Sequence, residues 1–298
     1  MKKIESVLVI GKNGQLASSF NKVDHLKKLI FIGQNDFNYL DRKSIYEKLN
    51  ELKPQVIINC AAYTLVDLAE TETDKCQKLN VDFLIYITDW CIVNTARLIH
   101  FSTDYVFDGT KDGPYIEADP VCAVNWYGKT KALGEKYLTE SKVESVIFRI
   151  SWVYSEFGNN FLKTMIRLGK EKENLNIVSD QIGSPCYAVN VAEVIYQWIF
   201  ENNLNTFKKG IYHLATDKTI SWYEFAGHIF SEYKKTQVDL KLVNLGQINT
   251  TDYKTAALRP LNSKMNSDHA KFELNLKLQS FDESLQRAIQ SLLKNQVV

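Results

Sequence analysis

The chain has 298 residues, of which 45% are hydrophobic, and its formal net charge is +1. This length and composition allow a substantial core in one large or two smaller domains. The nearly balanced charge, without an acidic or basic tail, gives no sign of a nucleic-acid partner or of binding to a membrane surface. The apolar run Val7–Ile10 is too short for a signal peptide, and no stretch reaches the ~20 apolar residues of a membrane span.

The five cysteines are widely spaced and include no Cys-x-x-Cys pair. This pattern favours reduced thiols in a cytoplasmic protein. No group of His, Cys and carboxylate residues has metal-ligand spacing, so we expect no metal site.

Val7–Ile10 is predicted to be a buried strand, followed by the turn Gly11-Lys-Asn-Gly14-Gln-Leu-Ala17 and a helix. Strand, glycine turn and helix form the context in which such a motif indicates dinucleotide binding. Gly11 allows a tight turn, and Gly14 lets the backbone approach a pyrophosphate at the helix N-terminus. The spacing is G-x-x-G-x-x-A rather than G-x-G-x-x-G, so an ordinary strand-to-helix turn remains the alternative.

A second strand is predicted at Leu29–Gly33, where a dinucleotide site usually selects between NAD and NADP. Asp36 comes one step late for the ribose 2′-hydroxyl, and no basic residue stands beside it. Neither cofactor is therefore selected by this region. Asp41 is a candidate for an adenine contact, although an N-cap of the helix starting near Ser44 is the favoured alternative.

Two further strands end in residues suited to a site. Val56–Asn59 runs into small residues that leave room for a flat ligand. The helix that follows carries Asn80, which we interpret as a buried structural amide. Leu98–Phe101 leads into the hydroxyl pair Ser102 and Thr103. Catalytic groups often occupy this edge of a parallel sheet, but capping of the turn is the alternative.

Tyr127 and Lys131 stand four residues apart, so they share one face of a helix. A nearby ammonium lowers the pKa of a phenol by roughly 1–3 units, which would make Tyr127 a usable general acid or base. Taken alone the pair is weak, because it also describes a solvated helix face.

The alternation of strands and helices up to the strand Val146–Ile150 predicts an α/β fold, a Rossmann-type doubly wound parallel sheet. We assign residues 1–155 to an NAD(P)-binding Rossmann domain. Residues 156–298 are expected to form mainly a smaller α/β substrate-binding domain, with some segments returning to the sheet. Its expected elements are helices at Phe161–Lys172, Val191–Phe200 and Trp222–Tyr233 (capped by Ser221), a strand at Ile211–Leu214 and a polar turn at 180–185.

The chain resembles the extended short-chain dehydrogenase/reductases from end to end, and among them the dTDP-4-dehydrorhamnose reductase family. The Ser-Thr-Asp-Tyr-Val-Phe string and the Asp-Gln-Ile-Gly-Ser-Pro turn are the most specific features. The matching segments are Gly11–Leu16, Asn59–Glu70, Ser102–Gly109, Asn125–Lys131, Ser151–Tyr154, Gly158–Phe161, Asp180–Pro185, Ser221–Phe225 and Arg259–Pro260.

This resemblance implies that NADPH or NADH reduces the C4 ketone of a dTDP-4-keto-6-deoxy sugar to dTDP-L-rhamnose, for cell-surface polysaccharide synthesis. It implies catalytic roles for Thr103, Tyr127 and Lys131. The cofactor would contact Gly11, Asn13, Gly14, Gln15, Leu16, Asp41, Ala61, Ala62, Tyr63, Tyr127 and Lys131. The substrate would contact Thr103, Asp104, Tyr127, Trp152, Asn160 and Arg259. Core packing is the alternative for Trp152, and a surface ion pair is the alternative for Arg259.

Two departures from the family pattern affect these expectations. Some members bind Mg²⁺ between subunits through acidic side chains, whereas this chain has Ser19 and Asn190 at the matching positions. Without carboxylates a hard cation loses its main ligands, so we expect no Mg²⁺ and no Mg²⁺-dependent dimer, although a homodimer stays open. The region after Gln34 is also short, which weakens the assignment of Asp41.

Two other functions stay open from the sequence. One is a reductase or C4 epimerase of another nucleotide sugar. The other is a non-catalytic dinucleotide-binding subunit, like the regulatory β subunit of methionine adenosyltransferase. The presence of Thr103, Tyr127 and Lys131 argues against the second.

Overall fold

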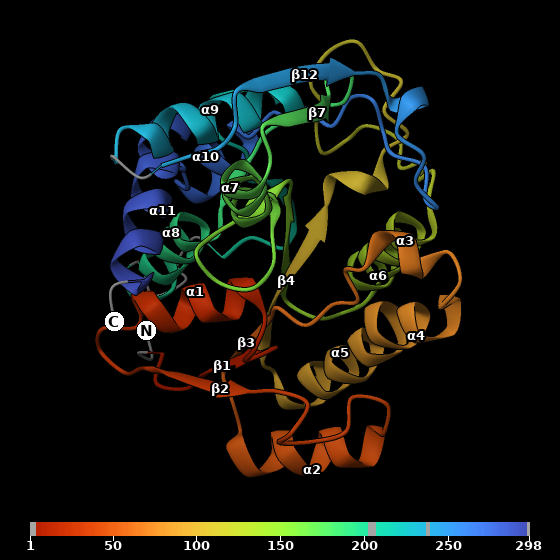
Figure 1. The fold of residues 1–298 in the computed structure, drawn as a ribbon. Coiled ribbons are helices and arrows are strands. Elements are labelled where there is room, and N and C mark those ends of the chain that lie inside the picture. Colours follow the sequence, from red (N-terminus) through yellow and green to blue (C-terminus); the bar gives the residue numbers. More distant parts are fainter. Residues whose placement is uncertain (1–3, 202–206, 237–238, 297–298) are drawn as a thin grey trace.

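A six-stranded parallel sheet forms the centre of the computed structural model, which describes residues 4–201, 207–236 and 239–296 (Figure 1). Its order is β2-β1-β3-β4-β5-β10, and the Rossmann-type doubly wound sheet predicted from the sequence is confirmed. The strands are β1 (Val7–Ile10), β2 (Leu29–Ile32), β3 (Val56–Asn59), β4 (Arg97–Thr103), β5 (Ser145–Ile150) and β10 (Gly210–His213).

Uninterrupted apolar runs explain why the central strands are buried on both faces. Val7–Ile10 is buried throughout, as is Val56–Asn59, and strands of this composition are typical of sheets covered on both sides. β1 lies between β2 and β3. The chain therefore adds β2 on one side of β1 and then crosses over to add β3 on the other side. A crevice opens at such a switch point, between the loops that follow β1 and β3.

Helices cover the two faces of the sheet, and each face has its own apolar core (Figure 1). α1 (Gln15–Val23) and α8 (Ala188–Phe200) pack together on one face. α2 (Arg42–Leu52), α5 (Phe83–Asn94) and α6 (Trp126–Glu140) cover the other. α6 carries the Tyr127 and Lys131 pair, so its place beside the sheet decides where that pair lies.

A π-helical turn, η1 (Lys78–Asp82), joins α4 (Thr73–Gln77) to α5, and the short helix α3 (Val66–Ala69) precedes them. This turn carries Asn80, which is buried and accepts a hydrogen bond from the backbone N–H of Tyr63 at 2.8 Å. Its amide nitrogen donates to the Thr130 hydroxyl at 3.0 Å. The prediction of a structural amide is confirmed.

The second half of the chain adds helices and three two-stranded sheets beside the central sheet. The helices are α7 (Phe161–Glu171), α9 (Trp222–Lys234), α10 (Asp268–Leu274) and α11 (Phe281–Gln296), with a 3₁₀ turn, η3, at Thr250–Asp252. Another 3₁₀ turn, η2 (Asp104–Val106), follows β4 in the first half. The small sheets pair β6 (Val153–Tyr154) with β9 (Cys186–Tyr187), β7 (Asn174–Val178) with β12 (Asn244–Ile248), and β8 (Ile182–Gly183) with β11 (Ile220–Ser221).

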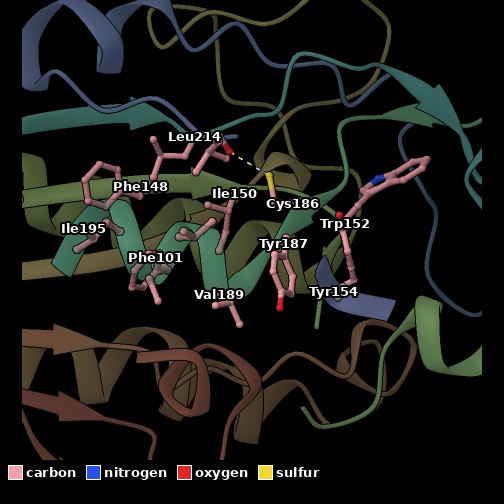
Figure 2. Close-up of a cluster of buried hydrophobic side chains, with 14 of the residues drawn as sticks. Phe101, Phe148, Ile150, Trp152, Tyr154, Cys186, Tyr187, Val189, Ile195 and Leu214 are labelled. Carbon is pink, nitrogen blue, oxygen red and sulfur yellow. Dashed lines mark hydrogen bonds between the residues drawn. The ribbon is translucent and has the colours of Figure 1, made fainter. Parts of the chain in front are cut away.

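Side chains from both halves share one core (Figure 2). Phe101 and Phe148 of the central sheet pack with Ile195 of α8, and the Cys186 thiol donates to the Leu214 carbonyl at 3.2 Å. β10 pairs with β5 as the outer strand of the central sheet. The division of the chain at residue 155 stays a prediction.

Most of the predicted elements of the second half agree with the structure. Ser221 caps α9 through a capping box with Glu224, as expected. α8 begins at Ala188 rather than at Val191, and the turn predicted at 180–185 contains β8. Within the described residues, no helix is long and apolar enough to cross a membrane.

Candidate active site

Gly11, at the end of β1, forms the floor of the crevice. Its φ of 103° is one that residues with a side chain rarely adopt. A Cβ at this position would stand 2.9 Å from the backbone nitrogen of Ala61, at the end of β3. The glycine is therefore required both by the turn and by the close approach of the two loops.

The N-terminus of α1 faces this crevice without a side-chain cap. Gly14 is the N-cap residue, and the first turn of α1 contains no acidic residue. The first backbone N–H groups of a helix have no partner within it, so they attract an anion such as a pyrophosphate. The adjoining cavity of ≈ 200 Å³ is lined by Gly11, Asn13, Gly14, Gly33, Gln34, Tyr39, Cys60, Ala61, Ala62 and Leu79. These residues fit a dinucleotide.

Five of the eleven predicted cofactor residues line this cavity, namely Gly11, Asn13, Gly14, Ala61 and Ala62. The other six are not among its lining residues. Tyr63 lines a neighbouring cavity of ≈ 580 Å³. The Gln15 amide donates to the Val153 carbonyl and accepts from Asn160, and Leu16 packs against the core. Asp41 caps α2 by accepting from the Lys43 N–H at 3.0 Å. For Asp41 the capping alternative is thus seen in the structure, and an adenine contact stays a prediction.

Sequence reasoning missed several lining residues. Tyr39 and Leu79 lie in the cavity, and Lys75 and Lys78 line its neighbour from the other side. These residues belong to no motif, and the lysines come from a helical segment remote from β2.

Tyr127 and Lys131 both lie on α6, as their spacing of four residues predicted. Asn125 caps α6 by accepting from the Gly128 N–H at 2.8 Å, so Tyr127 and Lys131 stand one turn apart on the same helix. The Thr103 side chain is near enough to the Tyr127 phenol to lower its pKa in part. The structure therefore brings together two hydroxyls that are 24 positions apart in the chain.

Thr103 is bonded on several sides. Its hydroxyl donates to Asp104 Oδ1 at 2.9 Å and accepts from the Tyr105 N–H at 3.2 Å. It caps η2, so the capping alternative holds together with the contact to Tyr127. An oriented hydroxyl chain of this kind can bind a carbonyl oxygen of a substrate.

The expected lowering of the Tyr127 pKa by Lys131 is wrong. Burial raises the pKa of the Tyr127 phenol, the Thr103 side chain only partly opposes this rise, and Lys131 is not among the groups that lower it. Lys131 Nζ instead donates to the Phe101 carbonyl at 2.6 Å and lies 3.1 Å from His100 Nε2. Burial lowers the pKa of Lys131 to about 8.

Asp104 is buried beside Thr103. Burial raises the pKa of this carboxyl to about 6, although hydrogen bonds from Ser263 and Thr103 lower it in part. Its Oδ2 atom has no hydrogen-bond partner among the described residues. A buried carboxyl oxygen without a partner is costly, and a site that binds hydroxyl groups is one common reason to retain it.

Trp152 has a φ of 46° and stacks on Trp222, with ring centroids 3.5 Å apart. Gly183 lies against this ring, and a Cβ on it would stand 2.4 Å from the indole. Figure 2 shows the indole pointing away from the neighbouring core side chains. Trp152 thus packs against Trp222 at the edge of the core, as the packing alternative expected. Its contact with a substrate stays a prediction.

The two other predicted substrate residues make local bonds in this structure. Asn160 caps α7 by accepting from the Lys163 N–H at 3.2 Å, while its amide nitrogen donates to Gln15 at 2.7 Å. Arg259 forms an ion pair with Asp67 at 2.8 Å, which is the alternative considered for it. Their contacts with a substrate stay predictions.

The positions that bind Mg²⁺ in some relatives are also used locally. The Ser19 hydroxyl donates to the Gln15 carbonyl at 2.9 Å. Asn190 accepts from the Gln279 N–H at 2.7 Å and donates to Glu193 at 3.3 Å. Over the described ranges, no three His, Cys, Asp or Glu side chains gather as a metal site would require.

The dinucleotide crevice and the Thr–Tyr–Lys set beside it define a class, the short-chain dehydrogenase/reductases. Comparison with known proteins narrows this class. The family profile of the RmlD substrate binding domain matches residues 5–294. The chain therefore belongs to the dTDP-4-dehydrorhamnose reductase family, and the resemblance noted in the sequence is confirmed.

Individual relatives agree with this assignment. The dTDP-4-dehydrorhamnose reductase of Aggregatibacter actinomycetemcomitans is 40% identical over 264 residues, which cover 86% of this chain and 89% of the relative. The reductase of Salmonella typhimurium is 38% identical and covers 92% of each chain. A crystal structure of dTDP-4-dehydrorhamnose reductase from Bacillus anthracis in complex with NADP is 32% identical, with a TM-score of 0.88 over 97% of this chain and all of that chain.

Proposed function

We propose that this protein is an NAD(P)H-dependent dTDP-4-dehydrorhamnose reductase, which reduces the C4 ketone of dTDP-4-dehydro-6-deoxy-L-mannose to dTDP-L-rhamnose. The observation that carries the proposal is the placement of Thr103 beside the Tyr127 phenol, next to a dinucleotide crevice, in a chain of this family. Polysaccharide synthesis is the context that this product implies.

The reaction adds a hydride to the ketone carbon and a proton to its oxygen. A nicotinamide cofactor held in the crevice would supply the hydride, becoming oxidised as the ketone is reduced. Tyr127 supplies the proton from its hydroxyl, and Thr103 donates a hydrogen bond to the same oxygen as negative charge develops there. To do so, the Thr103 hydroxyl turns from Asp104 Oδ1 toward the substrate.

The electrostatics of the site suit the direction of reduction. Because the pKa of Tyr127 is raised, its phenol carries a proton throughout the neutral range. An alkoxide is a much stronger base than a phenolate, so proton transfer to the developing alkoxide still runs downhill. Oxidation of the alcohol needs the phenolate and is correspondingly disfavoured near neutral pH.

The substrate is held by groups around this pair. The unpartnered Oδ2 of Asp104 accepts from a sugar hydroxyl, and Trp152 packs against the sugar nucleotide. Arg259 offers its planar fork to the diphosphate after release from Asp67. Lys131, which donates to the Phe101 carbonyl, would hold the ribose of the nicotinamide. A cytoplasmic location and a homodimer stay predictions.

The test is NADPH oxidation by the purified protein, followed by absorbance with a panel of 4-keto nucleotide sugars. We expect turnover with the dTDP-4-keto-6-deoxy sugar only when NADPH or NADH is added. Turnover without added cofactor would indicate an epimerase, and preference for another nucleotide would indicate a sister reductase. The absence of turnover with every sugar, despite NADPH binding, would contradict the proposal.

A further inference from the structure

His100 is a buried histidine that the proposed reaction does not use. It lies on β4 directly opposite Asn59 of β3 in the parallel register, so both side chains project toward the face that α6 covers. Asn59 Nδ2 lies 3.1 Å from His100 Nδ1, and His100 Nε2 lies 3.1 Å from Lys131 Nζ. These contacts form a continuous line from the cofactor loop to Lys131, because Asn59 Oδ1 also accepts from the Ala61 N–H at 3.1 Å.

The donors in this line can be assigned from its fixed end. The Ala61 N–H can only donate, so the atom of Asn59 that it meets must be the oxygen. The amide nitrogen of Asn59 then faces His100, and it too can only donate. His100 Nδ1 must therefore carry a lone pair, and a neutral imidazole then has its proton on Nε2.

His100 is neutral because it is fully enclosed beside a second basic group. Burial, with the nearby Lys131 as a second cause, lowers the pKa of His100 well below its ordinary value. Its Nε2–H consequently points at Lys131 Nζ. An amine accepts this hydrogen through its lone pair, whereas an ammonium has no lone pair to offer.

We propose that His100, oriented by Asn59, is a positioning residue that donates its Nε2–H to Lys131 and thereby favours the uncharged amine of Lys131. The line is fully satisfied only in that state, in which Nζ still donates to the Phe101 carbonyl. If Lys131 becomes an ammonium, His100 Nε2 must accept its hydrogen, so the imidazole proton moves to Nδ1 and faces the N–H of the Asn59 amide. If the Asn59 amide flips instead, its nitrogen faces the Ala61 N–H. In either case two donors meet.

Other groups around Lys131 act in the opposite direction. Besides His100 on β4, the titratable groups that act on it are Cys76 from α4 and Glu135 from α6, and both raise the pKa of Lys131. Glu135 is itself held by Arg149 of β5, whose guanidinium lies 2.6 Å from it. Burial lowers the pKa of Lys131 by more than Glu135 and Cys76 together raise it. We expect the hydrogen bond from His100 to lower this pKa as well.

A consequence for catalysis rests on the proposed function. The phenol of Tyr127 stays protonated well above neutral pH, so it does not set the alkaline limb of the rate profile. Burial lowers the pKa of Lys131 to about 8. In the proposed reaction, its ammonium would be the form that holds the cofactor ribose. We therefore assign the alkaline limb of kcat/KM to Lys131 and its position partly to His100.

The first test needs no turnover. NMR of isotope-labelled histidine nitrogens in the intact protein is expected to show His100 as a neutral Nε2–H tautomer above the midpoint of the Lys131 titration. An imidazolium or an Nδ1–H tautomer there would overturn the proposal, whatever the enzyme reduces. NMR of labelled lysine side chains gives the titration of Lys131 itself, with Lys131→Met to assign its signal.

Substitutions then separate the hydrogen bond from burial. His100→Phe keeps an enclosed apolar ring but removes the donor, so the Lys131 midpoint and the alkaline limb are expected to rise by about half to one pH unit. His100→Gln restores a donor and is expected to return both toward the wild-type values. An unshifted midpoint in His100→Phe would overturn the proposal.

His213→Phe is the matched control. His213 is also buried and lies on β10, where it contacts Arg149 at 3.2 Å rather than Lys131. This variant is expected to lower stability without moving the Lys131 midpoint. Equal shifts in the two phenylalanine variants would mean that loss of packing, and not the His100 donor, moves the titration, which would also overturn the proposal.

Discussion

A Cβ placed on Gly128 would stand 2.1 Å from the carbonyl oxygen of Tyr105. α6 thus approaches the turn after β4 so closely because residue 128 has no side chain. Tyr127 precedes this glycine, and Thr103 lies two residues before Tyr105. The contact between Gly128 and Tyr105 therefore fixes how close the two reactive hydroxyls come.

Gly128→Ala is expected to displace α6 from this turn. Overpacking of this kind costs about 1–3 kcal/mol, and the separation of Tyr127 from Thr103 should reduce kcat beyond what the lost stability explains. Gly227→Ala in α9 is the matched control, because no heavy atom lies within 4 Å of its Cβ position. That change is expected to stabilise the protein by roughly 0.5–1 kcal/mol. Similar urea midpoints and rates for the two variants would contradict the account.

Asp104→Asn is expected to stabilise the protein above neutral pH while it lowers activity. The folded-state pKa of Asp104 lies above its ordinary value, rising from 3.8 to about 6, so its ionised form opposes folding. This opposition is fully present above the folded pKa and disappears as pH falls through the unfolded value. The gain should reach about 3 kcal/mol near pH ~8 and vanish below pH ~4, measured by urea unfolding.

Asp24→Asn is the control for Asp104. Asp24 is also buried, but its carboxylate accepts from the N–H groups of Lys28 and Leu29, at 2.8 and 3.0 Å. The amide leaves one of these donors without an acceptor, so this change is expected to destabilise the protein at every pH above neutrality. A stabilising effect of both asparagine variants would show that burial of charge is not what distinguishes Asp104.

Glu135→Gln is expected to cost about 3–5 kcal/mol, because it leaves the Arg149 guanidinium buried without its counter-charge. The two side chains are 4% and 1% exposed and form two hydrogen bonds, at 2.6 and 2.9 Å. Glu140→Gln one turn later breaks an exposed pair with Lys136 at 3.9 Å and should cost less than about 0.5 kcal/mol. Thermal unfolding of both variants distinguishes these values.

The sequence was informative wherever a local pattern determines geometry. Gly11 had to be a glycine for the turn after β1, and the spacing of Tyr127 and Lys131 places both on one helix face. The sheet follows from short apolar runs that alternate with helical patterns. These features depend on neighbours in the chain.

Contacts made across the fold were not predictable in the same way. His100 meets Asn59 only through the register of two parallel strands, and Gln15 is bonded to Asn160, 145 positions later. The pKa of Tyr127 was predicted in the wrong direction because burial and the contact of Lys131 with Phe101 depend on tertiary packing.

The most direct test of the proposed chemistry is the single-turnover rate of NADPH oxidation with the dTDP-4-keto-6-deoxy sugar, in wild type and Tyr127→Phe. Tyr154→Phe serves as the control, since the buried Tyr154 hydroxyl has no hydrogen-bond partner in the described parts of the chain. We expect Tyr127→Phe to bind NADPH normally but to react roughly 100- to 10,000-fold more slowly, while Tyr154→Phe keeps the wild-type rate. A wild-type rate for Tyr127→Phe would contradict the central claim that this phenol delivers the proton.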